Sequence, residues 1–153
     1  MNFKRRNLEA LADLIVGNPG RDDAKNEDEA KYFPYRSSMY ITEFFRELKT
    51  EYQHDGSTRH RWVAGVLEQI LAEPHDGPNR LPEVFCRLID QLMSPADPLN
   101  EGSDRPRAIE QLNEILGREG FEAFYGEDDH CYLRHVGTQT VTILAANTSP
   151  PLQ

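Results

Sequence analysis

Apolar residues recur along the chain at the three- and four-residue spacing of an amphipathic helix in five separate stretches. The first, residues 5–16, ends at Gly17, and a helix commonly stops at such a glycine. The other four stretches lie near residues 38–48, 59–71, 81–92 and 106–117. The pattern therefore predicts about five helices, and we expect the second, third and fourth of them to form the core.

After Gly120 the pattern changes to short runs of aromatic and β-branched residues around an acidic turn: "FEAFY", "GEDD", "HCYLRHV" and "TVTIL". Such runs are typical of antiparallel strands. The sequence thus predicts an α+β fold, mostly helical, with a small C-terminal antiparallel β-hairpin or three-stranded sheet.

Residues 1–146 fit one domain, and 147–153, "NTSPPLQ", resemble a linker-like tail. The chain is therefore a candidate amino-terminal module of a longer protein. Residues 18–31 are polar and lack apolar periodicity, so we expect a surface loop there.

The composition is that of a soluble globular protein: 38% of the 153 residues are hydrophobic, 28% are charged, and the formal net charge is -9. This acidic balance disfavours broad attraction to nucleic acid phosphates, which requires clustered Lys and Arg. The two cysteines, Cys86 and Cys131, lie far apart and suggest no disulfide framework. No apolar run approaches the length of a membrane span, and no signal peptide is recognisable. We therefore expect a cytoplasmic protein without membrane contact.

Motifs for catalysis or metal binding are weak. His130, Cys131 and His135 lie near the predicted hairpin but fall short of a usual ligand set, so we expect no metal and no cofactor. No glycine-rich phosphate loop or His-Glu-x-x-His helix occurs. Arg87 has Leu92 five residues later, so that helix does not form an Arg-x-x-x-x-His ribonuclease motif.

A catalytic alternative lies between the second and third helices. His54 and Asp55 stand beside the hydroxyl residues Ser57 and Thr58, so the residue types of a triad are present. No Gly-x-Ser-x-Gly elbow surrounds them. We favour the reading in which Asp55, Ser57 or Thr58 caps the third helix around a turn at Gly56, just as Ser37 or Ser38 caps the second.

A noncovalent binding site is the strongest functional signal. Tyrosines combine flat apolar rings with hydrogen-bond donors, and arginines can clamp a carboxylate or phosphate. The alternative is that the tyrosines cover helix seams while the arginines pair with Glu43, Glu47 or Glu51. The candidate binding residues are Tyr35, Arg36, Ser37 and Tyr40 in one segment and His54, Asp55, Arg59 and Arg61 in another.

The segments "YRSSMYITEFFRELKTEYQHDGSTRHRWVAGVLEQIL" and "AIEQLNEILGREGFEAF" resemble the amino-terminal modules of prokaryotic abortive-infection proteins of the AbiJ type. The resemblance implies a helical regulatory or sensing domain in antiphage defence, fused to or partnered with a separate toxic effector. It supplies no catalytic residues.

Three hypotheses follow. The first is a non-catalytic recognition module whose partner is another protein, an attached effector domain or a small trigger molecule. The second is a nuclease or other hydrolase that uses the His54 and Asp55 region. The third is a winged-helix-like DNA binder, because a helix followed by a hairpin is also the layout of a wing. A homo-oligomer is compatible with each of them.

Overall fold

The computed structural model describes residues 2–17, 32–74, 77 and 79–142, and its secondary structure confirms a mostly helical α+β fold. The proposed loop at 18–31 and the proposed tail at 147–153 lie outside these residues. No helix within the described ranges is long and apolar enough to cross a bilayer. The elements in order are α1 (Arg5–Val16), α2 (Ser38–Glu47), α3 (Arg59–Leu71), α4 (Glu83–Leu92), the 3-10 helix η2 (Pro98–Asn100), α5 (Arg105–Gly117), β1 (Phe121–Tyr125) and β2 (Cys131–His135).

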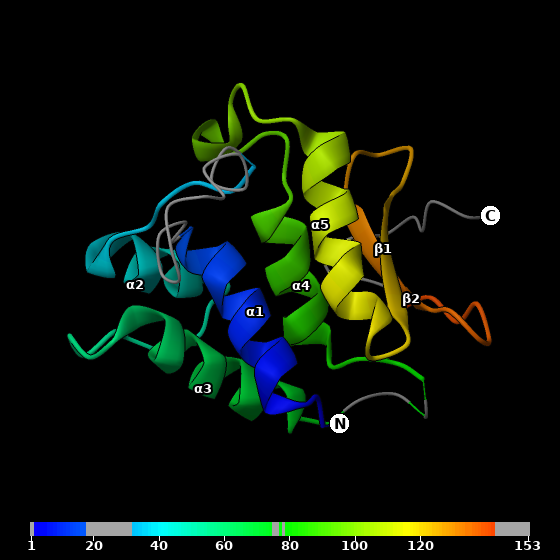
Figure 1. Cartoon of the computed structure of the whole chain (residues 1–153), viewed down its shortest axis with the longest axis horizontal. Coiled ribbons are helices and arrows are strands. Elements are labelled where there is room, and N and C mark those ends of the chain that lie inside the picture. Colours follow the sequence, from blue (N-terminus) through cyan, green and yellow to red (C-terminus); the bar gives the residue numbers. More distant parts are fainter. Residues whose placement is uncertain (1, 18–31, 75–76, 78, 143–153) are drawn as a thin grey trace.

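Helix α1 lies between α3 and α5, close to the centre of the molecule (Figure 1). We expected the second, third and fourth helices to form the core, and this expectation was incomplete. Leu8, Leu11, Ala12, Ile15 and Val16 are each at most 1% exposed. The apolar stripe of α1 is therefore wide enough to pack against two neighbours, whereas a helix at the edge of a domain needs only one buried face.

The end of α1 touches the segment that leads into α2. Gly17 ends α1 with a left-handed φ of 65°, and its N–H donates to the Asp13 carbonyl at 2.8 Å. A Cβ atom placed on Gly17 would lie only 2.0 Å from the Pro34 carbonyl oxygen. Two residues later, the Arg36 N–H donates to the Val16 carbonyl at 2.8 Å. This close backbone approach fixes where α2 can begin.

The C-terminal sheet is a two-stranded antiparallel hairpin that pairs Phe121 with His135 and Tyr125 with Cys131. The sequence also suggested a third strand. Within the described residues only an isolated bridge between Arg134 and Val141 is found there. The outer edge of β1 is covered by the Asn113 side chain of α5, which accepts from the Ala123 N–H at 2.7 Å and donates to the Ala123 carbonyl at 3.1 Å. The hairpin is thus joined to the helices by paired hydrogen bonds.

Replacing Gly17 with alanine should destabilise the protein more than replacing Gly102 with alanine. Both glycines have positive φ (65° and 78°), so both variants incur a backbone cost of about 1 kcal/mol. Only at Gly17 would the new methyl group collide with backbone, since no atom lies within 4 Å of that position at Gly102. We expect the loss in free energy of unfolding, measured by urea denaturation, to be at least about 2 kcal/mol larger for Gly17→Ala. Equal losses would contradict the close approach of α1 and Pro34.

Candidate functional site

The two segments that the sequence singled out meet at the amino-terminal ends of α2 and α3, which lie next to each other in Figure 1. The Arg59 guanidinium donates to the Arg36 carbonyl at 2.9 Å. The His54 N–H donates to the Thr42 hydroxyl at 3.0 Å, and the His54 ring contacts the Ser38 hydroxyl at 2.5 Å. Residues 12, 16 and 23 positions apart in sequence are therefore brought together at this surface.

The two helix starts differ in how their free N–H groups are satisfied. Ser37 caps α2 by accepting from the Tyr40 N–H at 3.5 Å, which confirms the cap we predicted there. The cap predicted for α3 is wrong: the Thr58 side chain makes no capping hydrogen bond. The Asp55 carboxylate instead accepts from the Ser57 N–H at 2.9 Å, because the turn at Gly56 folds it back onto its own loop. No described residue accepts from the first N–H groups of α3.

Asp55 is fully exposed, and its hydrogen bonds from Ser57 lower the pKa of the carboxyl below its ordinary value. The Asp55 carboxylate is therefore bound within the turn of its own loop. Asp55 makes no hydrogen bond to the His54 ring, so the two residues do not form the acid–base pair that a triad requires.

Arg36, which we expected to contact a ligand directly, is buried with only 1% exposed. Its guanidinium donates to the Ile15 carbonyl at 2.9 Å, lies 4.7 Å from the centroid of the Phe44 ring, and is 4.0 Å from the Asp97 carboxylate. Burial lowers the pKa of Arg36 to about 10, so the group remains charged at neutral pH. The side chain of Arg36 therefore points into the protein and binds the end of α1. Its role at this site is to hold the surrounding backbone in place.

An apolar surface patch lies above Arg36. We call it the Tyr35 patch and define it as Tyr35, Met39 and Tyr40, which are 57%, 69% and 49% exposed. The Arg59 guanidinium lies 4.5 Å from the centroid of the Tyr35 ring. Met39 was not among the binding residues predicted from the sequence. It could have been found there, because it is an apolar residue that lies outside the buried stripe of its helix.

Among the described residues, Arg36, Arg59 and Arg61 form no ion pair with Glu43, Glu47 or Glu51, although the charge of Glu47 favours the charged form of Arg36. Within the described ranges, Glu43 pairs with Arg46 at 3.1 Å, and neither Arg59 nor Arg61 forms an ion pair. Arg61 is exposed on α3.

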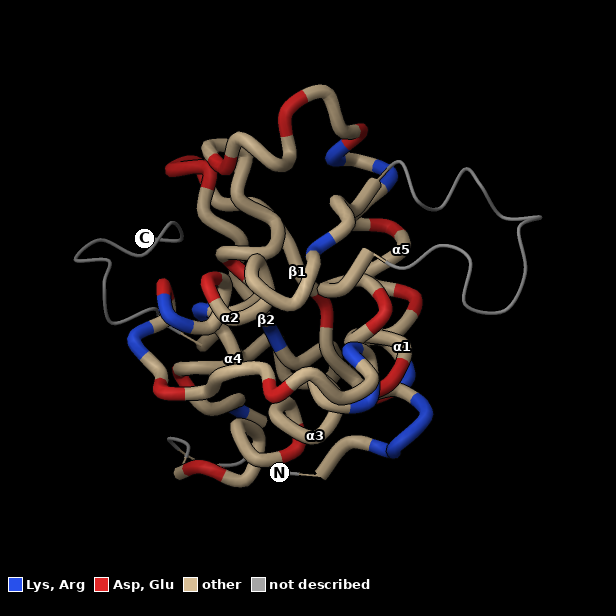
Figure 2. Tube along the Cα trace, turned by 90° about the vertical axis from the view of Figure 1, so that its left-hand side faces the viewer, with Lys and Arg blue, Asp and Glu red and all other residues tan. Residues whose placement is uncertain are grey.

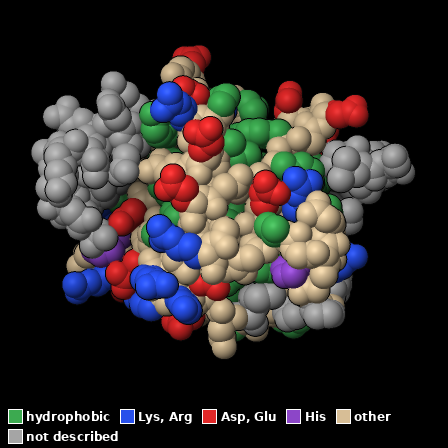
Figure 3. Space-filling model, turned by 45° about the vertical axis from the view of Figure 1, so that its right-hand side comes forward, with side chains coloured by type: hydrophobic (Ala, Val, Ile, Leu, Met, Phe, Trp, Pro, Cys, Tyr) green, Lys and Arg blue, Asp and Glu red, His purple; other side chains and the backbone are tan. Residues whose placement is uncertain are grey.

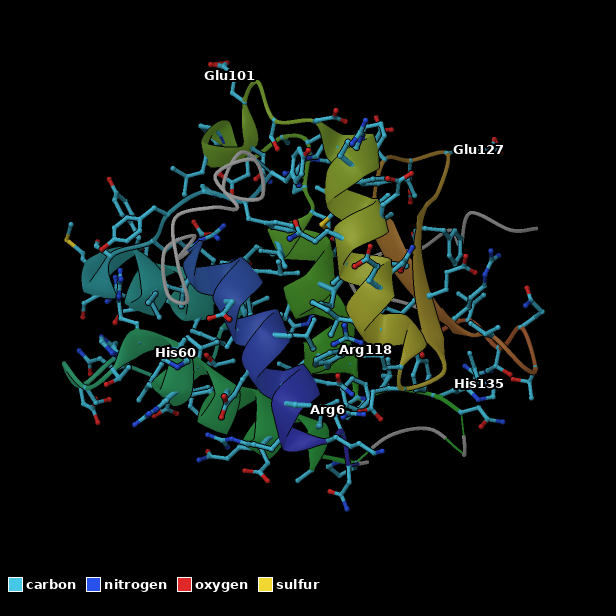
Figure 4. The ribbon with its side chains drawn as sticks, in the orientation of Figure 1. Arg6, His60, Glu101, Arg118, Glu127 and His135 are labelled. Atoms are coloured by element: carbon cyan, nitrogen blue, oxygen red, sulfur yellow. The ribbon has the colours of Figure 1, made fainter. Side chains whose placement is uncertain are left out.

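Beside the Tyr35 patch is an open hollow of about 360 Å³, which we call the α2–α3 hollow. Its lining contains hydroxyl and basic side chains and no carboxylate among the described residues. His60 is only 9% exposed, and no described residue forms a hydrogen bond with its ring. Figure 4 places His60 at the start of α3, on the side toward α2. The hollow is lined by Ser38, His54, Gly56, Ser57, Thr58, Arg59 and His60.

His54 is held in one orientation by its two ring nitrogens. Nε2 lies 2.8 Å from the Ser57 carbonyl, which can only accept, so we assign the ring proton to Nε2. Nδ1 then accepts from the Ser38 hydroxyl. The ring also meets Trp62 edge to face, with centroids 5.2 Å apart. Ser38 was missed as a partner of His54 because 16 residues separate them.

The remaining candidate groups are distant from this site. Cys86 and Cys131 are buried free thiols, and burial raises the pKa of Cys86 to about 12, so it stays protonated at neutral pH. No group of three His, Cys, Asp or Glu side chains within the described ranges is arranged to hold a metal ion.

A second groove of about 590 Å³ lies between α5 and β1. It is lined mainly by apolar side chains, including Ile109 and Phe124, and hydrophobic side chains reach the surface on that side (Figure 3).

An Asp–His pair joins α4 to the hairpin. The Asp90 carboxylate lies 2.8 Å from His130 Nδ1, and its other oxygen accepts from the Cys131 N–H at 2.7 Å. The hydrogen bond to Asp90, with further contributions from the charges of Asp90, Asp128 and Asp129, raises the pKa of His130. The His130 side chain is 44% exposed, so the pair links surface protonation to packing of the hairpin.

Comparison with known proteins finds no relative: no protein-family model matches the chain, and no curated protein or solved structure is significantly similar to it. The resemblance to AbiJ-type modules therefore stays a prediction from sequence motifs.

Because the folded state raises the pKa of His130, protonation of this residue should stabilise the fold. The stabilisation is complete below the unfolded-state pKa of about 6.5 and is lost as pH rises through the higher folded-state pKa. We expect Asp90→Asn, which keeps an acceptor for Cys131, to flatten the change in thermal stability between about pH 6 and about pH 8. An unchanged pH dependence in this variant would contradict the assignment.

Proposed function

We propose that this chain is a non-catalytic recognition or regulatory module of a prokaryotic antiphage abortive-infection system. It binds a protein partner or a small trigger molecule through the Tyr35 patch and the adjoining α2–α3 hollow. The single observation that carries the recognition role is the arrangement of Tyr35, Met39 and Tyr40 on the surface beside Arg59, with Tyr35 held against the arginine.

The Tyr35 patch has the composition of an interface centre. Tyrosine, methionine and arginine are enriched where proteins bind one another, and aromatic anchors supply most of the binding energy. The contact between Arg59 and Tyr35 restricts both side chains before a partner arrives. Less conformational entropy is then lost on binding.

The charge distribution supports a partner other than duplex DNA. The turn of the β1–β2 hairpin, which would be the tip of a wing, carries exposed Glu127, Asp128 and Asp129. These carboxylates would repel phosphates. Lys and Arg are interspersed with Asp and Glu along the trace and form no continuous basic stripe on the described residues (Figure 2).

The defence role rests on the resemblance of residues 35–71 and 108–124 to AbiJ-type modules. In such a system, the recognition surface would control a separate toxic effector, either on the same chain or on a partner. Assembly of several copies around that effector is compatible with this role, and a cytoplasmic location fits it because phage components are met there.

Replacing exposed residues of the Tyr35 patch should abolish function without unfolding the protein. We expect Met39→Ser combined with Tyr40→Ser to remove phage protection, measured as efficiency of plating on cells that carry the native locus. Both side chains are at least 49% exposed, so the thermal midpoint should change little. Val136→Ser is the matched control, because Val136 is 47% exposed on the distant hairpin. Full protection by the double variant would contradict the proposed surface.

A hydrolase is a second candidate, favoured by the 2.5 Å contact between the Ser38 hydroxyl and His54. His54 could accept the serine proton, but a neutral carbonyl orients the ring where a carboxylate usually does. A serine hydrolase would be labelled at Ser38 by a fluorophosphonate probe, and Ser38→Ala or His54→Ala would prevent labelling. We expect no labelling of the wild-type protein if recognition is its function, and mass spectrometry of the treated protein decides between the two.

A further inference from the structure

The groove between α5 and β1 is an apolar surface that the proposed function does not use. We call it the α5–β1 groove. It has a volume of about 590 Å³ and is formed by the link after α4, the first turns of α5 and the end of the hairpin. Pro95, Pro106, Ile109 and Phe124 give it an apolar wall. Its lining residues differ from those of the Tyr35 patch and the α2–α3 hollow, so it is a separate surface.

The edge of β1 that faces α5 carries backbone groups without a partner. In an antiparallel pair, alternate residues direct their N–H and C=O groups away from the neighbouring strand. Ala123 directs both groups to α5, where the Asn113 side chain binds them at 2.7 and 3.1 Å. Tyr125, two residues further on, faces the same edge, and the N–H of its strand partner Cys131 is donated to Asp90. Outside the hairpin, no described residue is hydrogen-bonded to the Tyr125 N–H or carbonyl.

These backbone groups lie at the groove. Helix α5 leads into β1 and the strand runs back along it, so residues earlier in α5 lie beside residues later in β1. Ile109 is one helical turn before Asn113 and lines the groove together with Tyr125. The Asn113 side chain thus takes the place of a neighbouring strand at Ala123, and the groove continues that place along the edge of β1.

The walls of the groove are fixed by contacts within the protein. The Tyr125 hydroxyl donates to the Met93 carbonyl at 2.6 Å. The Phe124 ring stacks on Tyr132 with centroids 6.0 Å apart, and the Arg134 guanidinium lies 4.6 Å from the Phe124 centroid. Side chains that are already held in place lose little conformational entropy when a ligand binds.

The free charge at the groove is negative. Arg105 lines it, but the guanidinium donates to the Tyr32 carbonyl and the Ser103 hydroxyl and is therefore directed into the protein. Asp129 also lines it, and neither Asp129 nor Glu127 forms an ion pair within the described ranges. Figure 4 shows Glu127 at the tip of the hairpin, on the side of the molecule where α5 begins. These carboxylates are complementary to a ligand that carries Lys or Arg.

We propose that the α5–β1 groove binds an extended peptide segment of a partner protein, in which a Lys or Arg stands beside an apolar residue. The peptide backbone pairs with the N–H and carbonyl of Tyr125 as an added strand. Its apolar side chain contacts Ile109 and Phe124, and its cation lies beside Asp129. An added strand satisfies the polar edge and the apolar wall together, whereas a small apolar molecule would leave the backbone groups unpaired.

Titration of the purified protein with three acetylated hexapeptide amides tests the site. The probes are Lys-Val-Lys-Val-Lys-Val, its backbone N-methylated derivative, and Glu-Val-Glu-Val-Glu-Val. We expect the lysine peptide to cause saturable shifts in the amide NMR signals of Tyr125 and Asp129. The N-methylated peptide cannot pair with the strand edge and the glutamate peptide is repelled, so both should bind at least about tenfold more weakly.

A variant with a matched control tests the charge. Asp129→Asn removes the carboxylate and keeps the turn, because Asn readily adopts the left-handed φ of 67° found at Asp129. It should weaken binding of the lysine peptide about threefold at low salt. Glu114→Gln removes the same charge from an exposed position of α5 outside the groove, and the affinity should stay unchanged. Equal weakening by both variants would show a nonspecific charge effect and overturn the site.

The other outcomes also decide the matter. Absence of saturable shifts with the lysine peptide would overturn the proposal. Equal binding of the N-methylated peptide would show that the groove takes apolar groups without strand pairing, which contradicts the proposed mode. A dimer in sedimentation that shifts the Tyr125 signal as concentration rises would identify a second copy as the occupant and rule out the partner segment. The Met39→Ser, Tyr40→Ser variant should bind the lysine peptide as the wild-type protein does, since neither residue lines the groove.

Discussion

The arrangement of the site depends on how Arg36 binds the carboxyl-terminal end of α1. Its backbone N–H and its guanidinium donate to the carbonyls of Val16 and Ile15, which a helix end leaves without intrahelical partners. A cation at this end is also favoured by the helix dipole. The Arg36 carbonyl then accepts from Arg59, so one residue connects the end of α1 to the starts of α2 and α3. The proposed recognition surface is therefore positioned by a buried cation.

A buried guanidinium is a costly way to make such a connection. Its pKa falls to about 10 because burial disfavours the charge, and Asp97 at 4.0 Å only partly offsets this. A second nitrogen of the group has no hydrogen-bond partner among the described residues. An apolar side chain would pack there at lower cost but would leave the α1 carbonyls unsatisfied. The arginine is thus explained by the connection it makes, since it satisfies carbonyls at the end of α1 where the backbones of Gly17 and Pro34 approach closely.

Much of this fold could be predicted from periodicity, while the site could be predicted only in part. The helix ends at Gly17 and Ser37 and the strands after Gly120 follow from local chemistry, which the sequence displays directly. The burial of Arg36 could not be foreseen, because it depends on the carbonyls of a helix 21 residues away. The pairing of Ser38 with His54 and the central place of α1 are also long-range outcomes, and a pattern of neighbours does not encode them.

The predicted cap of α3 failed for an instructive reason. Asp55, Ser57 and Thr58 are all competent caps by type, yet the turn at Gly56 directs the Asp55 carboxylate to Ser57 and the Ser57 carbonyl to His54. Leaving a helix without a cap costs about 1 kcal/mol. The starts of α1 and α4 likewise have no side-chain cap, so these helices are stabilised by the packing of their apolar faces and not by capping.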